Sequence, residues 1–266
     1  MDWEIFPWWK GVSRPVVGML HLAALPGSPR FGGSVEAIAD AMLRDAEALA
    51  EGGVHAVMLE NFGDAPFFPA QVPRYVVAHM TALACQVRRR FELPLGINVL
   101  RNDATAALAV AHASGASFIR VNVLCGARVT DQGLIQAAAH DLLRERAALG
   151  AAVRILADVD VKQSAPLAAR SMADEVADTL QRGLADGLIV SGSATGKPAD
   201  LAHLRAAKEA AGKTPVFVGS GVTAETVNTY MPYCEGFIIG SAFKRDGRVD
   251  QPVDSARVRS IVAQVR

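Results

Sequence analysis

The sequence predicts a single closed (β/α)8 barrel, a TIM barrel, and three observations support this fold class. The chain is 266 residues long, which is the size of one such barrel. Short apolar runs bounded by Gly or Pro recur from Pro15 onward, and each is followed by a longer segment with helical periodicity. Eight such pairs without a dinucleotide-binding glycine fingerprint favour a closed barrel over an open doubly wound sheet.

The strands and helices are expected in alternation along the whole repeat. The strands are predicted at Val16 to Leu22, Ala56 to Asn61, Leu95 to Leu100, Phe118 to Leu124, Arg154 to Val161, Leu188 to Ser191, Val216 to Ser220 and Phe237 to Ser241. The helices are predicted near residues 34–51, 72–91, 103–114, 131–148, 170–184, 199–211, 223–231 and 252–265. Ser34, Asp103, Thr130 and Thr223 are the expected helix N-caps.

Two segments are expected: an aromatic extension at residues 1–14 and one barrel domain at residues 15–266. The extension contains Trp3, Phe6, Trp8 and Trp9. We expect these rings to close one end of the fold or to make an oligomer contact rather than to enter a membrane, because Pro7 interrupts any amphipathic helix there. A homo-oligomer is the expected assembly.

Composition excludes several classes of protein. Lys plus Arg and Asp plus Glu are both 27, so the basic surface of a general nucleic-acid binder is absent. Three separated cysteines give neither a disulfide framework nor a zinc motif. The N-terminus is not a signal peptide, and no apolar run approaches the roughly 20 residues of a membrane span. A cytoplasmic protein is expected, with peripheral membrane contact as an alternative.

The fifth predicted strand, Arg154 to Val161, leads into the most informative polar group. Strand alternation places Asp158, Asp160 and Lys162 on one face, opposite an aliphatic face. Two carboxylates and an ammonium on a buried strand face are costly to desolvate unless they are paired, so they indicate a site. A structural ion pair is the alternative interpretation.

The other strands repeat this pattern, and their polar faces converge on the C-terminal mouth of the barrel, where active sites of this fold lie. Glu60, Asp158, Asp160 and Lys162 are the catalytic candidates. The substrate-binding candidates are His21, Asn98, Arg120, Asn122 and Ser191.

Two glycine-bearing turns follow the seventh and eighth strands, where barrels of the phosphate-binding type hold a phosphate. The candidate phosphate ligands are Gly219, Ser220, Gly221, Gly240 and Ser241. Tight turns without a ligand are the alternative. The loop from Ser191 to Pro198 fails the P-loop spacing, so it is expected to be a hydroxyl-rich lid or a further phosphate contact.

Several strand-end motifs together resemble the BtpA family. They are His21-Leu22 with Leu25-Pro26-Gly27-Ser28-Pro29, Glu60-Asn61-Phe62-Gly63-Asp64, Gly96-Ile97-Asn98-Val99-Leu100-Arg101-Asn102-Asp103, Phe118-Ile119-Arg120-Val121-Asn122, Ala157-Asp158-Val159 with Val161-Lys162, Val190-Ser191-Gly192 with Thr195-Gly196, and Val218-Gly219-Ser220-Gly221-Val222-Thr223. The resemblance implies a phosphate-binding barrel. The family takes its name from a photosystem I biogenesis protein that associates peripherally with photosynthetic membranes.

Three functions remain open from the sequence. The first is an enzyme, a lyase, isomerase or hydrolase, that acts on a small phosphorylated sugar or nucleoside by carboxylate acid–base chemistry, with Lys162 as a Schiff-base nucleophile or an anion ligand. The second is a non-catalytic assembly or stability factor for photosystem I or another membrane complex. The third is metal-assisted hydrolysis, with a divalent metal on His21, Glu60 and Asp158. The sequence requires no cofactor, and flavin would be supported only by the shape of the phosphate turns.

Overall fold

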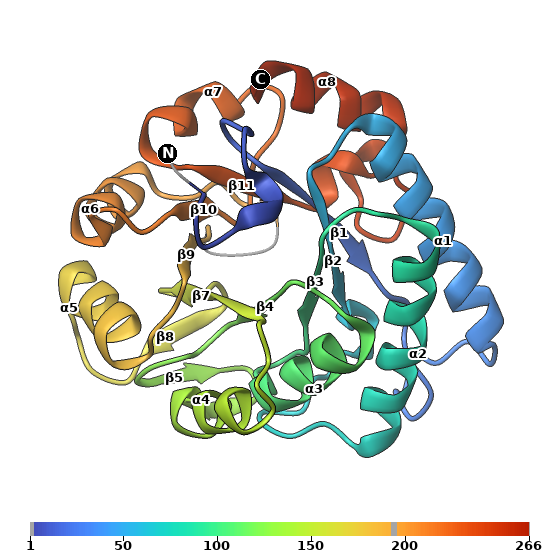
Figure 1. Cartoon of the computed structure of the whole chain (residues 1–266), viewed down its shortest axis with the longest axis horizontal. Helices are drawn as coiled ribbons and strands as arrows, with labels where there is room; N and C mark the ends of the chain where they lie inside the picture. The colour runs from blue at the N-terminus through green and yellow to red at the C-terminus, as the bar shows by residue number, and fades with distance from the viewer. Residues whose placement is uncertain (1–2, 193–195, 266) are drawn as a thin grey trace.

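The computed structural model describes residues 3–192 and 196–265. Within these ranges, eight parallel strands close into a barrel in the order β1-β11-β10-β9-β7-β4-β3-β2, and the helices form a ring around it (Figure 1). The first strand pairs with both the second and the last, so the barrel sheet has no free edge. The predicted fold class is confirmed.

The elements follow the predicted order. The barrel strands are β1 (Val16–His21), β2 (Ala56–Glu60), β3 (Leu95–Asn98), β4 (Phe118–Val121), β7 (Arg154–Val159), β9 (Gly187–Val190), β10 (Val216–Val218) and β11 (Gly236–Ile239). The α-helices are α1 (Val35–Gly52), α2 (Arg74–Arg90), α3 (Ala104–Ser114), α4 (Ala139–Ala148), α5 (Met172–Ala177), α6 (Leu201–Ala211), α7 (Val227–Tyr230) and α8 (Ser255–Val265). A π-helical turn, Asp178–Arg182, extends α5.

Polar caps fix where several helices begin. Ser34 Oγ accepts the Ala37 N–H at 3.1 Å at the start of α1, and Asp103 Oδ1 accepts the Ala106 N–H at 2.9 Å at the start of α3. Each cap satisfies one of the amide groups that a helix leaves without an intrahelical partner. These two caps lie where the sequence predicts them.

The barrel interior changes from apolar to polar along the strands. At the end where the strands begin, side chains such as Ala56, Phe118 and Phe217 form a buried apolar layer. Gly96 leaves room for this layer, because a Cβ at Gly96 would lie 2.3 Å from the Phe118 ring. Further along the strands several inward positions become polar; Arg120, for example, lies two residues after Phe118. Strand register places His21 beside Glu60 at the opposite end.

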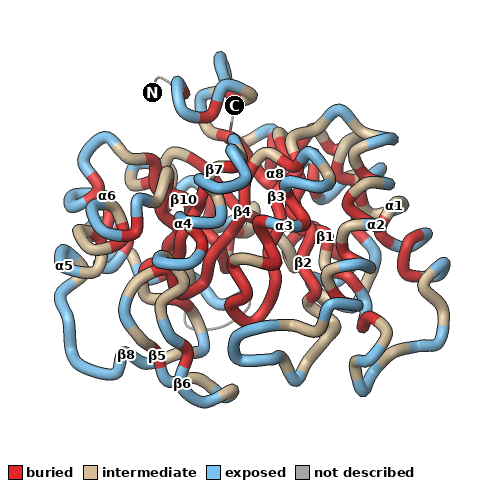
Figure 2. The backbone as a smooth tube through the Cα atoms, turned by 60° about the horizontal axis from the view of Figure 1, so that its bottom comes forward, coloured by how far each residue is buried: buried red, intermediate tan, exposed pale blue. Residues whose placement is uncertain are grey.

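The N-terminal segment closes the apolar end of the barrel. Trp3, Phe6 and Trp9 are buried against Phe118 and Phe217, with the Trp9 and Phe217 ring centroids 5.5 Å apart. The segment lies at one end of the molecule, opposite the mouth (Figure 2). Because these rings are buried in the barrel core, they are unavailable as a membrane anchor.

A three-stranded antiparallel sheet is the main departure from the predicted elements. It consists of β5 (Ala127–Thr130), β6 (Gly133–Gln136) and β8 (Ser164–Pro166), and lies at the mouth end (Figure 2). The helix expected at 131–148 therefore begins only at Ala139, and Thr130 ends a strand instead of capping that helix. Gly133, with φ of +92°, permits the tight β5–β6 hairpin. The Ala- and Leu-rich residues that follow it have a helical pattern, and the predicted helix therefore extends back over the hairpin.

In residues 3–192 and 196–265, no helix combines the length and apolar character that a bilayer crossing requires.

The N-terminal closure predicts a measurable contribution to stability. We expect Trp9→Ala to lower the free energy of unfolding by about 3 to 5 kcal/mol, because it removes a fully buried ring and leaves a cavity. Urea denaturation would measure the loss. Ile5→Ala, at a side chain 38% exposed in the same segment, is the matched control. Equal small effects of the two changes would contradict a closing role for Trp9.

Candidate active site at the barrel mouth

The buried pair Arg120 and Asp158 occupies the centre of the mouth. Arg120 Nε donates to Asp158 Oδ2 and Nη2 donates to Oδ1, both at 2.8 Å, and the two side chains are at most 2% exposed. Asn122 Nδ2 also donates to Asp158, at 3.1 Å, and Ser191 Oγ donates at 3.2 Å. The Asp158 carboxylate is therefore fully engaged, and this geometry suits a positioning group better than a free base.

Asn98 joins this network from β3. Its Nδ2 lies 3.4 Å from both the Arg120 carbonyl oxygen and Asn122 Oδ1. Its Oδ1 is buried and has no hydrogen-bond partner among the described residues. A buried acceptor without a partner is costly.

His21 and Glu60 lie side by side on neighbouring strands. His21 Nε2 is 3.7 Å from Glu60 Oε1. Burial, followed by the charges of Lys244, Lys162 and Arg120, lowers the pKa of His21 to about 3, so the imidazole is neutral at physiological pH. Burial raises the pKa of Glu60, against the opposing effect of the nearby cations. Glu60 is thus the mouth carboxylate poised to exchange a proton.

Lys162 reaches the same cavity from a turn after β7. The residues Asp160 and Gln163, on either side of Lys162, have φ of 53° and 55°, which is the left-handed region. The guanidinium of Arg101 donates to the Lys162 carbonyl oxygen at 2.6 Å and holds this turn. Burial and the Arg120 guanidinium lower the pKa of Lys162 to about 8.

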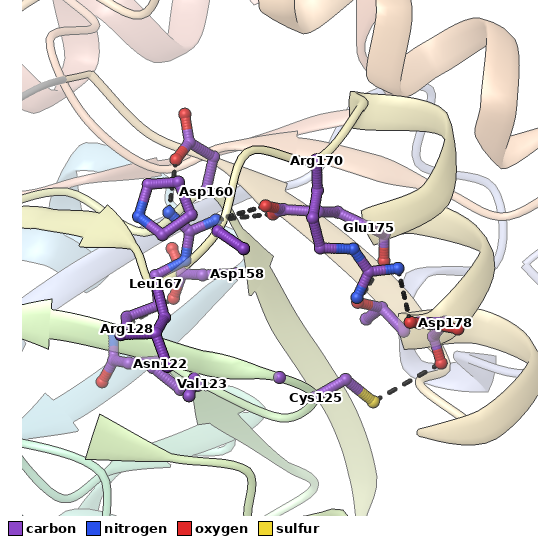
Figure 3. A pocket seen from close by; sticks show the side chains of 15 residues that line it. Asn122, Val123, Cys125, Arg128, Asp158, Asp160, Leu167, Arg170, Glu175 and Asp178 are labelled. Atoms are coloured by element: carbon purple, nitrogen blue, oxygen red, sulfur yellow. Dashed lines mark hydrogen bonds and ion pairs between the residues drawn. The ribbon is translucent and has the colours of Figure 1, made fainter. Parts of the chain in front are cut away.

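Asp160 does not join the other mouth residues, contrary to the face expected from alternation. The strand ends at Val159, and the left-handed turn directs Asp160 to Arg128, whose Nη1 donates to it at 2.6 Å (Figure 3). Arg128 Nη2 also donates to Glu175, and the exposed His203 lies 3.5 Å from Asp160. Asp160 is thus part of an ion-pair network beside the mouth.

This network lines a second space, which we call the side cavity. It lies between β5, β8 and α5; Asn122 and Asp158 line it, whereas their neighbour Arg120 lines the mouth cavity. Its charged groups are already paired: Arg128 with Asp160 and Glu175, and Arg170 with Asp178 at 2.7 Å (Figure 3).

The mouth cavity contains both the titratable groups and the glycine turns. It is small, with a cavity volume of about 30 Å³. Its lining includes His21, Glu60, Arg120, Lys162, Gly219, Ser220, Gly221, Gly240 and Ser241. The candidate phosphate ligands therefore lie across one small space from Glu60 and Lys162.

The backbone amides of the two turns differ in availability. The Gly219 N–H donates to the Val190 carbonyl at 2.9 Å, and Ser220 Oγ accepts the Gly192 N–H at 2.6 Å. The N–H groups of Gly221 and Ser241, by contrast, have no acceptor within the described part of the chain. Free amides in such turns are suited to an anion. Gly221 must be glycine, because its φ is +70° and a Cβ would lie 2.3 Å from the Lys197 oxygen.

The loop expected to be a lid or phosphate contact is only partly described. Gly192 and Gly196 flank Ser193, Ala194 and Thr195, which lie outside the described residues.

Two buried cations near the site were not among the predicted site residues. Arg101 follows β3 directly and crosses to the turn of Lys162; its burial lowers its pKa. Lys244 follows β11 and pairs with Asp45 of α1. Arg101 and Lys244 are charged residues that follow strands, and this position could have marked them as candidate site residues. The directions of their side chains depend on turns, which strand alternation does not describe.

The proposed metal set, His21, Glu60 and Asp158, is not supported by the donor geometry. Both Asp158 oxygens are occupied by Arg120, which leaves only His21 and Glu60 near each other. Among the described residues there is no group of three or more His, Cys, Asp or Glu side chains placed to hold a metal ion.

The structure is a single (β/α)8 barrel whose mouth cavity is lined by titratable side chains and two glycine-bearing turns. The sequence matches the BtpA family over residues 12–266, and the chain belongs to that family. It is 46% identical over 249 residues to the photosystem I biogenesis protein BtpA of Synechocystis sp., covering 94% of this chain and 87% of that protein. An uncharacterized protein of Thermococcus kodakarensis is 45% identical, with 94% of each chain covered.

Solved structures with similar folds include enzymes at low sequence identity. N-(5'-phosphoribosyl)anthranilate isomerase from Pyrococcus furiosus is 13% identical with a TM-score of 0.58, covering 95% of this chain and 98% of that one. KGPDC from Streptococcus mutans is 13% identical with a TM-score of 0.60, covering 95% and 97%. At these identities the similarity establishes the fold alone.

The mouth geometry predicts opposite effects of two conservative changes. Asp158→Asn should lower the free energy of unfolding by about 3 to 5 kcal/mol, because it leaves the buried Arg120 charge without its partner. Glu60→Gln should leave stability unchanged or raise it. A carboxyl whose pKa is raised on folding loses stability as pH rises above its unfolded value, and the amide removes that loss at pH 7. Urea denaturation of both variants would measure this, and equal losses would contradict the separate roles.

Proposed function

We propose that the chain is an enzyme that acts on a small phosphorylated sugar or nucleoside, as a lyase, isomerase or hydrolase. The observation that carries the proposal is the mouth cavity itself. One wall holds Glu60 and Lys162, whose pKa values are shifted toward neutrality, and another holds the free amides of Gly221 and Ser241. Perturbed titratable groups and an anion site in one cleft are typical of active sites.

The roles follow from the contacts. Gly221 and Ser241 bind the phosphate through their N–H groups, with Gly240 shaping the turn; Gly219 and Ser220 maintain the surrounding backbone. Glu60 transfers a proton to or from the reacting carbon or its oxygen. Neutral His21 and Asn98 hydrogen-bond to substrate hydroxyls.

The Arg120–Asp158 pair, with Asn122 and Ser191, acts as a rigid floor to the cavity. Asp160 acts at a distance, because its pairing with Arg128 fixes the turn that presents Lys162. Neither carboxylate is assigned a proton-transfer role.

The comparisons support a phosphorylated substrate in one respect. The solved barrel from Pyrococcus furiosus is named as an isomerase of a phosphoribosyl compound, N-(5'-phosphoribosyl)anthranilate. A barrel of the same architecture thus accommodates a phosphorylated sugar, and the position of the free amides in this chain is compatible with that class of ligand.

A second candidate is a non-catalytic assembly factor for photosystem I or another membrane complex. It is favoured by the name of the Synechocystis relative at 46% identity. Such a factor would use an outer surface, with peripheral membrane contact or homo-oligomer formation, and would not need the buried mouth groups. Variants of the mouth therefore separate the two candidates.

The test is a panel of phosphorylated sugars and nucleosides, scored for binding and turnover. A bound ligand at 100 times its Kd should raise the free energy of unfolding by about 2.7 kcal/mol in the wild type. Turnover, followed by NMR, should fall by about 100-fold or more in Glu60→Gln.

Two matched variants isolate the anion site. Ser241→Asp places a negative charge beside the free amides and should abolish stabilisation by phosphorylated ligands. Ser260→Asp, the same change at an exposed position on α8, should preserve it. Equal affinity for phosphorylated and unphosphorylated compounds in the wild type, or no turnover of any of them, would refute the proposal and favour the assembly factor.

A further inference from the structure

Lys162 is held in place by its backbone rather than by a partner of its ammonium group. Left-handed residues lie before and after it, at Asp160 and Gln163. The Arg101 guanidinium binds its carbonyl oxygen at 2.6 Å, and Ser164 Oγ donates to the Val161 carbonyl at 2.5 Å. Non-glycine residues in this backbone region are strained, and such strain is concentrated at functional sites.

The side-chain amine of Lys162 differs from those of two other lysines that are at least partly buried. Lys244 pairs with Asp45, and Lys208 pairs with Glu235 at 2.7 Å. Within the described residues, by contrast, no carboxylate lies within ion-pair distance of Lys162 Nζ, although the side chain lines the mouth cavity. An amine without a counter-ion in a polar cleft is available to a ligand.

The surroundings of Lys162 favour a nucleophile over an anion ligand. An amine that only binds phosphate gains by keeping its full charge, whereas burial and Arg120 lower the pKa of Lys162 to about 8. Desolvation and a neighbouring cation are the means by which proteins activate a lysine toward carbonyl groups. The phosphate, in turn, has the free amides of Gly221 and Ser241.

We infer that Lys162 forms a Schiff base with the carbonyl carbon of a phosphorylated aldehyde or ketone, a substrate class that rests on the proposed function and narrows it. The neutral amine attacks the carbonyl carbon, a C–N bond forms, and one amine proton passes to the oxygen to give a carbinolamine. Glu60, in its protonated form, gives a second proton to that hydroxyl, which leaves as water. The products are an iminium and the Glu60 carboxylate, so atoms and charge balance.

Glu60 is suited to this step by position and protonation. It lines the same cavity as Lys162, and burial raises its pKa, which favours the protonated form. After water leaves, its carboxylate faces the iminium. It can then remove a proton from the carbon next to the iminium, which gives an enamine, and this step is shared by aldol addition and isomerisation.

Reductive trapping tests the inference directly. The probes are dihydroxyacetone phosphate, glyceraldehyde 3-phosphate and ribose 5-phosphate, with dihydroxyacetone as the unphosphorylated control, and borohydride is the reductant. Mass spectrometry should find one reduced adduct per chain, on the peptide that contains Lys162. At pH 7 its labelling should exceed that of exposed lysines on the order of a hundredfold, given their usual pKa near 10.4, and should increase as pH rises through about 8.

Variants separate failure of this inference from failure of the proposed function. Lys162→Arg keeps a positive charge and should lose labelling while retaining stabilisation by the phosphorylated probes. Lys208→Arg, outside the cavity, should label normally. Phosphate-dependent stabilisation without any Lys162 adduct would overturn the Schiff base and leave the anion site. Labelling spread evenly over many lysines would also overturn it. Absence of phosphate-dependent stabilisation would refute the proposed function as well.

Discussion

Two hydrogen bonds between Arg120 and Asp158 determine the layout of the barrel mouth. The side chains come from adjacent strands, β4 and β7, and meet in a space with almost no solvent. Charges in such a space must be paired, so Asp158 accepts from Arg120, Asn122 and Ser191 and has no capacity left for other work. The pair thereby separates the mouth cavity from the side cavity.

The titration of the other mouth groups follows from this neutral centre. The charges of Arg120 and Asp158 shift the pKa values of Glu60 and Lys162 in opposite directions and so offset one another in part. Burial therefore dominates both, raising the pKa of Glu60 and lowering that of Lys162. Neutral His21 adds no charge. The cavity thus holds groups with shifted pKa values, and the proposed anion binding relies on backbone amides.

Much of this arrangement could be predicted from residue alternation. The barrel strands are continuous apolar runs, and the inward polar positions of His21, Glu60 and Arg120 follow from period-two geometry. Alternation fails where the strand ends. Asp160 was expected beside Asp158, but its left-handed backbone directs it to Arg128, and only a tertiary ion pair determines that turn. Arg101 and the β5–β6–β8 sheet were missed for the same reason: their contacts join segments distant in sequence.

The most direct measurement of the central claim is a crystal structure of the protein with a bound phosphorylated sugar. The phosphate should lie within hydrogen-bond distance of the Gly221 and Ser241 amides, with the reacting carbon facing Lys162 and Glu60. A phosphate bound instead in the side cavity, beside Arg128 and Arg170, would contradict an active site at the barrel mouth.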